Sequence, residues 1–336
     1  MYKAKYAFIV PVYNVASYLE ECLDSLLAQS FSDFLIVLVN DGSFDESGDI
    51  CDKYASLDSR VSVIHQKNAG LSAARNVGVS NSDSEYIIFI DSDDYWLANN
   101  SLDKINIIIN ESSNLEMLCF KRRYLYSNKK LTPPSREYSP VANITDVSTT
   151  LFSLLITEQL DCSACLKVVN KKFIEKHDLY FKRGLLSEDV EWFMRCILKL
   201  TSLQLAPISC YVYRCQREGS ITNTVNIKNL QHILDTIESF YLIDKGTWHE
   251  SEKGKVILSF LAYQLSIVIG YYSKLNKKDK LLIDHRVTVL LPLLKLGVMP
   301  KVSKVEKLVG VFGYKIASYI LSYYIFFRQA GWVGRK

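Results

Sequence analysis

Residues 86–94 read Tyr86-Ile-Ile-Phe-Ile-Asp-Ser-Asp-Asp94, an apolar run of five residues followed by three carboxylates and a serine. Such a run, bounded by polar residues, is typical of a β-strand buried on both faces. Carboxylates that directly follow a strand of a parallel sheet lie at its carboxyl edge, where α/β proteins bind ligands. The stretch therefore predicts one strand of an α/β fold and a functional site at its end.

Three further strand signals precede this run, and segments with helical spacing separate them. The strands are expected over 7–12, 34–39 and 61–65, and the helices over 17–29, 46–57 and 71–79. This βαβαβαβ order predicts a parallel, doubly wound sheet with right-handed crossovers.

Polar clusters follow all four predicted strands, at Pro11–Asn14, Asn40–Ser43, His65–Gly70 and Asp91–Asp94. Each cluster taken alone is an ordinary turn or helix cap. Because carboxylates follow more than one strand, we favour a shared site over independent turns.

The rest of the chain changes character twice. Residues 127–145 are polar and contain prolines, and they are followed by helical signals over 145–157 and 187–200 and short strands near 166–170, 203–206 and 210–214. Past Thr224 the sequence is almost entirely helical. We expect an α/β domain over 1–224, in two parts (1–125 and 126–224), and a helical region over 225–336.

Composition narrows the classes of function. The 336 residues are 49% hydrophobic and 23% charged, which excludes a disordered chain and a disulfide mini-scaffold. The net charge of +4 is unevenly placed. Residues 241–336 hold 16 basic and 6 acidic residues, a net of +10, which leaves −6 for residues 1–240. The two ends of the chain are therefore expected to meet different partners.

Eight cysteines are scattered through mostly apolar segments. Only Cys162 and Cys165 have the spacing of a metal or redox pair, and no second pair or histidine cluster accompanies them. We interpret the cysteines as free thiols in a reducing cytosol.

Two apolar stretches lie in the basic C-terminal region. Residues 256–273 carry no charge, and 311–327 carry only Lys315. Eighteen residues are near the lower limit for crossing a bilayer. We favour helices that pack on the protein or lie in a membrane interface.

Asp91 and Asp93 are candidate metal ligands. Two carboxylates one residue apart offer the hard oxygen atoms that Mg²⁺ and Mn²⁺ prefer, and such ions often complete their shell with substrate phosphates. The alternative is a structural turn in which Asp94 caps a helix.

Asp41 ends the second strand and is a candidate contact to a nucleoside. The chain has neither a Gly-x-Gly-x-x-Gly fingerprint nor a P-loop. A nucleotide would therefore be held by acidic residues and metal rather than by a glycine cradle.

Further charged residues lie near the predicted edge. Gly70 precedes a helix whose N-terminus favours an anion, and Arg75 on that helix is suited to pair with Asp91 or with a diphosphate. Glu188 and Asp189 open a helix, where one acts as a general base or both stabilise the helix dipole. Arg214 and Arg217 lie in a segment that either closes over a nucleotide or forms a surface turn.

Taken together, these motifs resemble bacterial family-two inverting glycosyltransferases of the GT-A fold. The resemblance covers roughly residues 5–222 and rests on Pro11-Val-Tyr-Asn14, Asn40-Asp-Gly-Ser43 with Asp45, Asn68-x-Gly70 with Ala74-Arg-Asn76, Asp91-Ser-Asp-Asp94, Glu188-Asp189, and Tyr213-Arg214 with Gly219-Ser220. It implies a Rossmann-like, mostly parallel sheet with flanking helices. It also implies that 1–224 is a catalytic domain with a nucleotide-sugar-binding part (1–125) and an acceptor-binding part (126–224).

The resemblance also implies roles for individual residues. Asp189, with Glu188 beside it, would be the base that deprotonates an acceptor hydroxyl. Mn²⁺ or Mg²⁺ would be held by Asp93, with Asp91 beside it near the ribose or sugar. The donor, a UDP-sugar, would be bound by Pro11, Tyr13, Asp41, Asp45, Asn68, Gly70, Arg75, Asp91, Ser92, Arg214 and Arg217.

The resemblance and its departures define the expected function. The chain lacks the Gln/Arg-x-x-Arg-Trp motif and the unmistakable transmembrane helices of processive members, which favours addition of a single sugar. The implied acceptor is a lipid-linked oligosaccharide of capsule, exopolysaccharide or O-antigen synthesis. The implied location is cytoplasmic, on the inner face of the cell membrane, which the basic C-terminal helices would contact.

Two other functions remain open: transfer of a polyol phosphate or similar group from a CDP donor, and an inert nucleotide-binding scaffold. A nucleic-acid partner is not expected, because the sequence contains no recognised nucleic-acid motif.

Overall fold

The computed structural model describes residues 3–97, 99–134, 138, 144, 146–215, 226–241, 243–244 and 246–329, with side chains up to residue 324. The chain divides into two compact units. Unit 1 comprises Met1–Val147 and Asp161–Ser220, and unit 2 comprises Ser148–Leu160 and Ile221–Lys336.

Unit 1 is built on a seven-stranded sheet with the order β3-β2-β1-β4-β8-β6-β9. Its strands are β1 (Ala4–Val12), β2 (Phe34–Asn40), β3 (Val61–His65), β4 (Ser84–Phe89), β6 (Met117–Cys119), β8 (Lys167–Asn170) and β9 (Leu203–Leu205). The first four strands run parallel. Strand β8 is antiparallel to both of its neighbours. The carboxyl ends of β1 to β4 therefore share one edge, as the sequence predicts.

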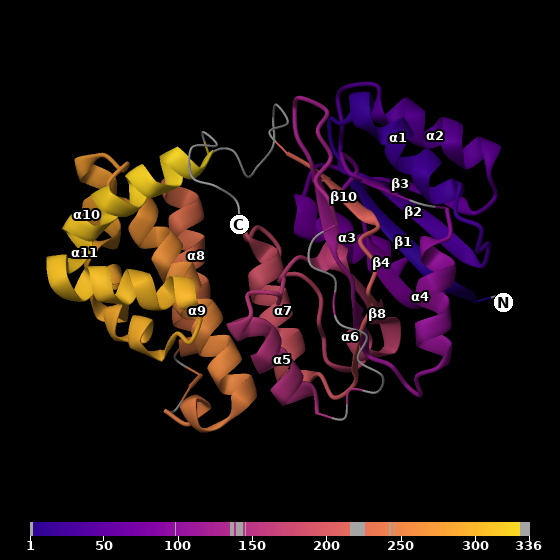
Figure 1. The fold of residues 1–336 in the computed structure, drawn as a ribbon. Coiled ribbons are helices and arrows are strands. Elements are labelled where there is room, and N and C mark those ends of the chain that lie inside the picture. The colour runs from indigo at the N-terminus through magenta and orange to yellow at the C-terminus, as the bar shows by residue number, and fades with distance from the viewer. Residues whose placement is uncertain are drawn as a thin grey trace. The chain divides into compact units, whose positions relative to one another are not determined.

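Helices cover both faces of this sheet. They are α1 (Ala16–Leu27), α2 (Ser47–Leu57), α3 (Leu71–Ser80), α4 (Ser101–Asn110), α6 (Lys171–Lys176) and α7 (Glu188–Lys199). Because each crossover is right-handed and the strand order reverses after β3, α1 and α2 lie on one face and α3 on the other (Figure 1). Gly78 allows α3 to pack tightly on the sheet, since a Cβ there would be 2.3 Å from Cγ2 of Ile9.

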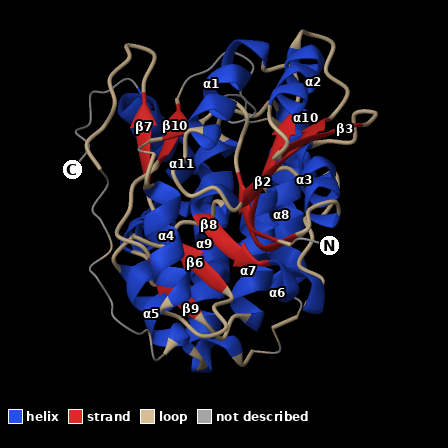
Figure 2. Ribbon diagram, turned by 90° about the vertical axis from the view of Figure 1, so that its right-hand side faces the viewer, coloured by secondary structure: helices blue, strands red, loops and turns tan. Residues whose placement is uncertain are grey.

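A second, three-stranded sheet extends unit 1 beyond the Asp91–Asp94 turn. Strand β10 (Tyr211–Arg214) pairs antiparallel with β5 (Tyr95–Trp96) and parallel with β7 (Arg122–Leu125). Figure 2 shows β7 and β10 side by side. This pairing brings Arg214 next to the turn, although more than a hundred residues separate them in sequence.

Unit 2 is helical. It contains α5 (Val147–Ile156), α8 (Ile227–Tyr241), α9 (Glu252–Tyr272), α10 (Lys277–Leu290) and α11 (Pro300–Gln329), together with the short 3-10 turns η3 (Trp248–Glu250) and η4 (Leu291–Leu296). Helix α9 packs against α8, α10 and α11. Thr149 of α5 donates a hydrogen bond to Glu252 at the start of α9 (Oγ1 to Oε2, 2.7 Å). Residues 148–160, which the sequence places in the acceptor-binding part, thus pack with the C-terminal helices.

The two apolar stretches of unit 2 adopt different environments. Helix α9 is long and apolar enough to cross a membrane, but 78% of its apolar window is buried, as in the core helix of a globular domain. Helix α11 is broken at Gly313, whose φ of +71° interrupts the helical geometry. Beyond this break, α11 exposes the side chains Ile316, Tyr319, Ile320, Tyr323 and Tyr324.

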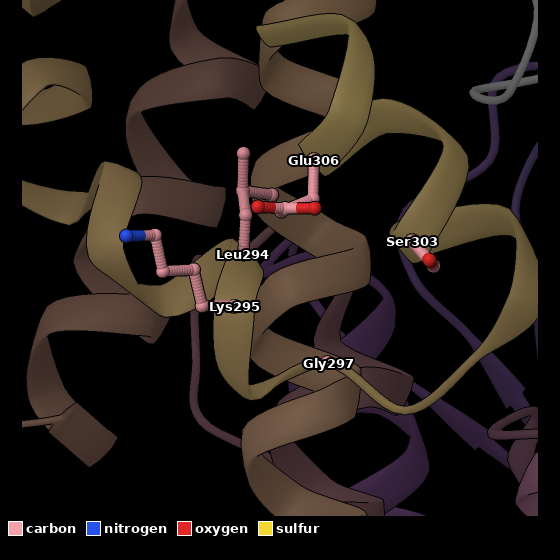
Figure 3. Close-up of a pocket in the computed structure, with 5 residues that line it drawn as sticks. All are labelled: Leu294, Lys295, Gly297, Ser303 and Glu306. Carbon is pink, nitrogen blue, oxygen red and sulfur yellow. The ribbon is translucent and has the colours of Figure 1, made fainter. Parts of the chain in front are cut away.

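A small pocket in unit 2 lies between η4 and the start of α11. It is lined by Leu294, Lys295, Gly297, Ser303 and Glu306 (Figure 3). None of the residues that the sequence marks as chemical candidates lines it.

All eight cysteines are free thiols, which confirms that no disulfide framework supports the fold, and six of them are buried.

Candidate active site

The carboxyl edge of strands β1 to β4 gathers most of the polar residues that the sequence predicts to act together. Asp41 follows β2 and is almost completely buried. Its Oδ1 accepts hydrogen bonds from Gln66 Nε2 (2.6 Å) and Ala69 N (2.8 Å), and its Oδ2 accepts one from Gly70 N (2.8 Å). Asp41 therefore fixes the loop that leads from β3 into α3.

Two neighbouring loops are joined in the same way. Asp45 accepts hydrogen bonds from Ala16 N (3.1 Å) and Ser47 N (3.0 Å), which ties the start of α1 to the start of α2. Gly42 has a φ of +74°, and a Cβ at this position would be 2.9 Å from Asn68 N. Only glycine allows the loop after β2, which holds Gly42, to approach the loop after β3, which holds Asn68, this closely.

The predicted residues at this edge differ in how exposed their side chains are. Tyr13 is exposed and packs edge-to-face on Phe44, with ring centroids 6.1 Å apart. Asn68 is also exposed, whereas Pro11 is buried within β1. Tyr13 and Asn68 are therefore accessible to a ligand at this edge, and the side chain of Pro11 lies beneath the surface.

The Asp91–Asp94 turn places its side chains in different environments. Asp91 and Asp93 are partly exposed, whereas Ser92 and Asp94 are buried. Asp94 accepts hydrogen bonds from the Tyr211 hydroxyl (2.5 Å) and from Arg214 N (2.8 Å). Burial, with Asp93 and Asp91 nearby, raises the pKa of Asp94 well above its usual range. Asp94 thus joins the turn to β10 rather than capping a helix.

Arg214 links the turn to α1. Its Nε donates to the carbonyl oxygen of Asp93 (2.9 Å) and its Nη2 donates to Glu21 Oε2 (2.8 Å). The guanidinium also lies over the rings of Tyr18 and Tyr95, with centroid distances of 5.0 and 5.4 Å. Arg217 lies outside the described residues.

Arg75 occupies the centre of the carboxylate cluster and is only 1% exposed. Its Nη1 donates to Glu188 Oε1 (2.8 Å) and to Asp189 Oδ1 (2.9 Å), and its Nη2 donates to Asp91 Oδ1 (2.8 Å). The sequence leaves Asp91 and a diphosphate open as partners of Arg75. The structure pairs Arg75 with Asp91 and with two further carboxylates. The guanidinium is thus engaged with three carboxylates in this structure, and its contact with a donor diphosphate stays a prediction.

Glu188 and Asp189 open α7 and lie in the cluster around Arg75. Ser187 precedes them at the N-cap with a φ of +63°, and its side chain makes no capping hydrogen bond. Burial and the neighbouring Asp189 raise the pKa of Glu188 to about 7, although Arg75 opposes the shift. A carboxylate that titrates near neutral pH is suited to proton transfer.

The metal prediction is compatible with the donor atoms present. Among the residues that the structure describes, no three His, Cys, Asp or Glu side chains gather as a ready-made metal site. Asp93 and the second oxygen of Asp91 supply a small number of hard ligands, because Asp91 Oδ1 is bonded to Arg75. This set fits a Mg²⁺ or Mn²⁺ ion that takes its remaining ligands from water and a diphosphate, and it does not fit an all-protein cage.

The sequence profile of the family described as Glycosyl transferase family 2 matches residues 7–176, which is half of the chain. The chain belongs to glycosyltransferase family 2. The matched range contains Asp41, Arg75 and the Asp91–Asp94 turn, and it ends before Glu188.

Several bacterial glycosyltransferases are similar in sequence to this family-two chain. Glycosyltransferase GlyA of Streptococcus pneumoniae is 53% identical over 91 residues, which are 27% of this chain and 13% of GlyA. EpsJ of Bacillus subtilis is 55% identical over 89 residues, 26% of either chain. These matches span only a minor part of each relative. The poly(ribitol-phosphate) β-N-acetylglucosaminyltransferase TarS of Staphylococcus aureus is 26% identical over 286 residues, 82% of this chain and 47% of TarS.

Solved structures show that the fold is GT-A. The structure of TarS residues 1–349 with UDP-GlcNAc superimposes with a TM-score of 0.69 at 22% identity, covering 98% of this chain and 93% of that one. The mannosyltransferase PcManGT from Pyrobaculum calidifontis, solved with GDP-Man and Mn²⁺, gives a TM-score of 0.52 at 14% identity, covering 97% and 88%. The expected Rossmann-like, mostly parallel sheet with a helical C-terminal region is thus confirmed.

Residues that the sequence did not predict to lie at the candidate site also contact it. Tyr211 holds Asp94, and Gln66 holds Asp41. Phe181 lies against Arg75, with 5.1 Å from the guanidinium carbon to the ring centroid. Cys165, which the sequence marks only by its spacing from Cys162, lies 3.8 Å from Arg75 Nη2. No short motif predicts that these residues lie at the site, because each reaches it through strand pairing or loop packing.

Proposed function

We propose that this family-two chain is an inverting glycosyltransferase that moves a single sugar, a hexose or N-acetylhexosamine, from a UDP-sugar to a hydroxyl group of a lipid-linked oligosaccharide. The observation that carries the proposal is the joint contact of Asp91, Glu188 and Asp189 with one guanidinium. It unites a base at the start of α7 with the carboxylates after β4. A donor held by the carboxylates after β4 would present its anomeric carbon to an acceptor hydroxyl activated by the base at the start of α7.

The proposed step has a simple balance. The acceptor hydroxyl gives its proton to Asp189 while its oxygen forms a bond to the anomeric carbon. The bond between that carbon and the diphosphate oxygen breaks, and its electron pair leaves with UDP. Attack from the face opposite the diphosphate inverts the configuration. Glu188 is the alternative base, since its pKa of about 7 suits proton transfer near neutral pH.

We infer that the nucleoside is bound at the edge where Tyr13 and Asn68 are exposed, with Asp41, Asp45 and Gly70 shaping the loops beneath it. Pro11 and Ser92, whose side chains are buried, would support this place from β1 and from the turn. Arg214 lies against the turn, and Arg217 would join it on the diphosphate. The TarS complex with UDP-GlcNAc supports a UDP donor, because TarS shares the fold.

A divalent ion would be held by Asp93, with Asp91 beside it. The ion would neutralise charge on the departing diphosphate as a Lewis acid. The Mn²⁺ in the mannosyltransferase complex, which shares the fold, supports this choice of ion.

We further propose that unit 2 contacts the inner face of the cytoplasmic membrane, where a lipid-linked acceptor of capsule, exopolysaccharide or O-antigen synthesis would be found. The surface concerned is the outer face of α11, defined by Ile316, Tyr319, Ile320, Tyr323 and Tyr324. A contiguous exposed apolar patch of this kind usually marks a binding surface, and tyrosine favours the membrane interface.

Charge selects an anionic lipid surface as the partner of this face. Exposed Lys274, Lys277 and Lys278 lie at the turn between α9 and α10. Ser273 Oγ of that turn donates to the Ser318 carbonyl of α11 (3.2 Å), and Lys280 lies 5.8 Å from the Tyr319 ring centroid. Lysines beside exposed aromatic and aliphatic side chains complement acidic headgroups above an acyl layer.

Donor turnover by the purified full chain tests the proposed reaction. Release of UDP or GDP from UDP-hexoses, UDP-N-acetylhexosamines and GDP-mannose, and of CMP from CDP-polyols, is measured with Mn²⁺, with Mg²⁺ and with a chelator. We expect turnover of a UDP-sugar that depends on the ion and is lost in Asp93→Asn. The matched control is Asp58→Asn, which removes a carboxylate paired with Arg60.

The alternatives give different results in the same assay. Turnover of a CDP-polyol alone would establish the group-transferase alternative. Tight UDP binding without turnover of any donor would establish an inert nucleotide-binding scaffold.

A further inference from the structure

Arg75 is held more firmly than a substrate-binding arginine needs to be. The side chain leaves α3, and its guanidinium lies against the rings of Phe89 and Phe181, whose centroids lie 5.9 and 5.1 Å from the guanidinium carbon. Its Nε is buried and has no hydrogen-bond partner within the part of the chain that the structure describes. An unsatisfied buried donor is costly, so the orientation of the guanidinium is set by its two Nη atoms and their partners.

Those partners come from separate elements of the fold. Asp91 follows β4, whereas Glu188 and Asp189 begin α7, which is more than a hundred residues away from Arg75 in sequence. One cation faces three carboxylates, so the cluster is held together by charge-assisted hydrogen bonds to a single side chain. Removal of the cation from such a buried cluster leaves its carboxylates to repel one another.

The hydrogen bonds also distinguish the two oxygens of Asp189. Oδ1 accepts from Arg75 Nη1 at 2.9 Å, and the same Nη1 donates to Glu188 Oε1 at 2.8 Å. Oδ2 is the oxygen that Arg75 does not hold. A base fixed through one oxygen presents the other in a constant direction, which a freely rotating carboxylate would not do.

We propose that Arg75 is the positioning residue of the base: it orients Asp189 through Oδ1, leaves Oδ2 to take the acceptor proton, and couples this base to Asp91 on the donor side. This inference rests on the proposed function. It replaces the diphosphate contact that the sequence allowed for Arg75 with a role that requires no contact with substrate.

The geometry requires a guanidinium rather than any cation. Nη1 bonds to the two carboxylates of α7 and Nη2 to Asp91, whereas the single ammonium of lysine cannot hold the same three partners in fixed directions. The substitution Arg75→Lys would conserve the charge and lose the fork. Comparison of the lysine and alanine variants therefore separates charge from positioning.

The test uses Arg75→Lys and Arg75→Ala in the full chain, with the UDP-sugar and ion found in the donor panel. UDP affinity is measured by calorimetry, kcat by transfer, and folding by circular dichroism. We expect kcat to fall by about 100-fold or more in both variants, while UDP affinity changes by less than about fivefold. Added guanidinium ion should restore part of kcat in Arg75→Ala and none in Arg75→Lys, whose ammonium still fills the site.

The matched control is Arg60→Lys. Arg60 also forms a forked pair with a carboxylate, Asp58, and stacks on a ring, that of Phe34, but it lies before β3 at the opposite edge of the sheet. We expect wild-type kcat from this variant.

The possible outcomes separate failure of the proposed function from failure of the positioning role. Absence of turnover in the wild-type chain refutes the proposed function, not the positioning role. Wild-type kcat in Arg75→Lys, loss of UDP affinity in parallel with kcat, or absence of guanidinium rescue in a folded Arg75→Ala would overturn the positioning role. Failure of both variants to fold would assign Arg75 to structure alone and overturn it as well.

Discussion

The two units depart from the usual distribution of polar and apolar residues in opposite directions. Unit 1 buries charge: Arg75, Asp94, Lys167 and Glu191 are all at most 1% exposed. Unit 2 exposes apolar surface: on α11, Ile316 is 56% and Tyr323 65% exposed. Most charged side chains remain in water, and large apolar patches are rare on the surface of a monomer.

This difference indicates that the buried ionisable groups of unit 1 are suited to chemistry and that the exposed apolar face of unit 2 is suited to a binding partner. A buried ionisable side chain is retained only if it has hydrogen-bond partners, and Arg75 and Asp94 of unit 1 find theirs beside the Asp91–Asp94 turn. An exposed apolar face is stabilised when it is removed from water, so the α11 face is the surface for which a binding partner is proposed. The following experiments challenge this contrast, beginning with the largest expected effect.

Replacement of the base should have the largest effect. Asp189→Asn removes the proton acceptor and keeps the size of the side chain, so transfer should fall by about 10²–10⁴-fold. UDP affinity should remain near that of the wild type. If Asp189→Asn retains transfer and Glu188→Gln loses it, the base is Glu188 and the roles of the pair are reversed.

Helices α9 and α11 are expected to differ in how much truncation of one side chain lowers the free energy of unfolding. Leu261 in α9 is fully buried, so Leu261→Ala should lower the free energy of unfolding by about 2–5 kcal/mol in urea denaturation. Ile320 in α11 is exposed, and Ile320→Ala should change it by less than about 0.5 kcal/mol. Equal destabilisation by both variants would mean that the α11 face is covered within the protein itself.

The raised pKa of Glu188 predicts how the free energy of unfolding of unit 1 depends on pH. Its pKa rises from 4.5 to about 7 on folding, so the folded state keeps a proton that the unfolded chain has already released. Stability is therefore full below about pH 4.5 and is lost as pH rises through 7, by an amount on the order of 3 kcal/mol.

Urea denaturation at several pH values measures this dependence. Glu188→Gln should flatten the loss between about pH 4.5 and 7, and the exposed Glu111→Gln should leave it unchanged. An unchanged slope in Glu188→Gln would place the titration elsewhere.

The smallest expected effect concerns the membrane surface. Lys274→Gln, Lys277→Gln and Lys278→Gln should each weaken co-sedimentation of the full chain with phosphatidylglycerol vesicles by about 1 kcal/mol. Ile320→Ser should weaken it as well, and the exposed Lys199→Gln in unit 1 should not.

Two outcomes would contradict the membrane proposal. Binding that is insensitive to salt and to anionic lipid would remove the lipid surface as the partner. Self-association in light scattering that Ile320→Ser abolishes would replace it with a second copy of the chain.

Much of the fold follows from local sequence pattern. The four N-terminal strands, the three helices between them and the common edge of the strands were predictable, because continuous apolar runs and helical spacing repeat with short connections. The placement of β8 between β4 and β6, antiparallel to both, was not. It depends on pairing between distant segments, which the pattern of a single strand does not encode.

The site was predictable in composition and less so in contacts. Asp41, the Asp91–Asp94 turn and the Glu188–Asp189 pair could be chosen because they follow strands or begin a helix. That Asp94 is buried under Tyr211, and that Arg75 binds three carboxylates rather than lying open to a diphosphate, could not. Burial and partners at long range decide which of several chemically suitable roles a charged side chain takes.

The sequence by itself determined the α/β architecture, the edge where polar residues gather and the uneven charge of the two ends, since these depend on periodicity and composition. Only the tertiary structure decided which apolar helix is core and which is surface: α9 and the second half of α11 are both rich in apolar residues, but α9 is surrounded by neighbouring helices and one face of α11 is not. It also decided that Arg75 unites Asp91 with Glu188 and Asp189. Apolar side chains and carboxylates acquire their roles from what surrounds them, and chain folding alone brings those surroundings together.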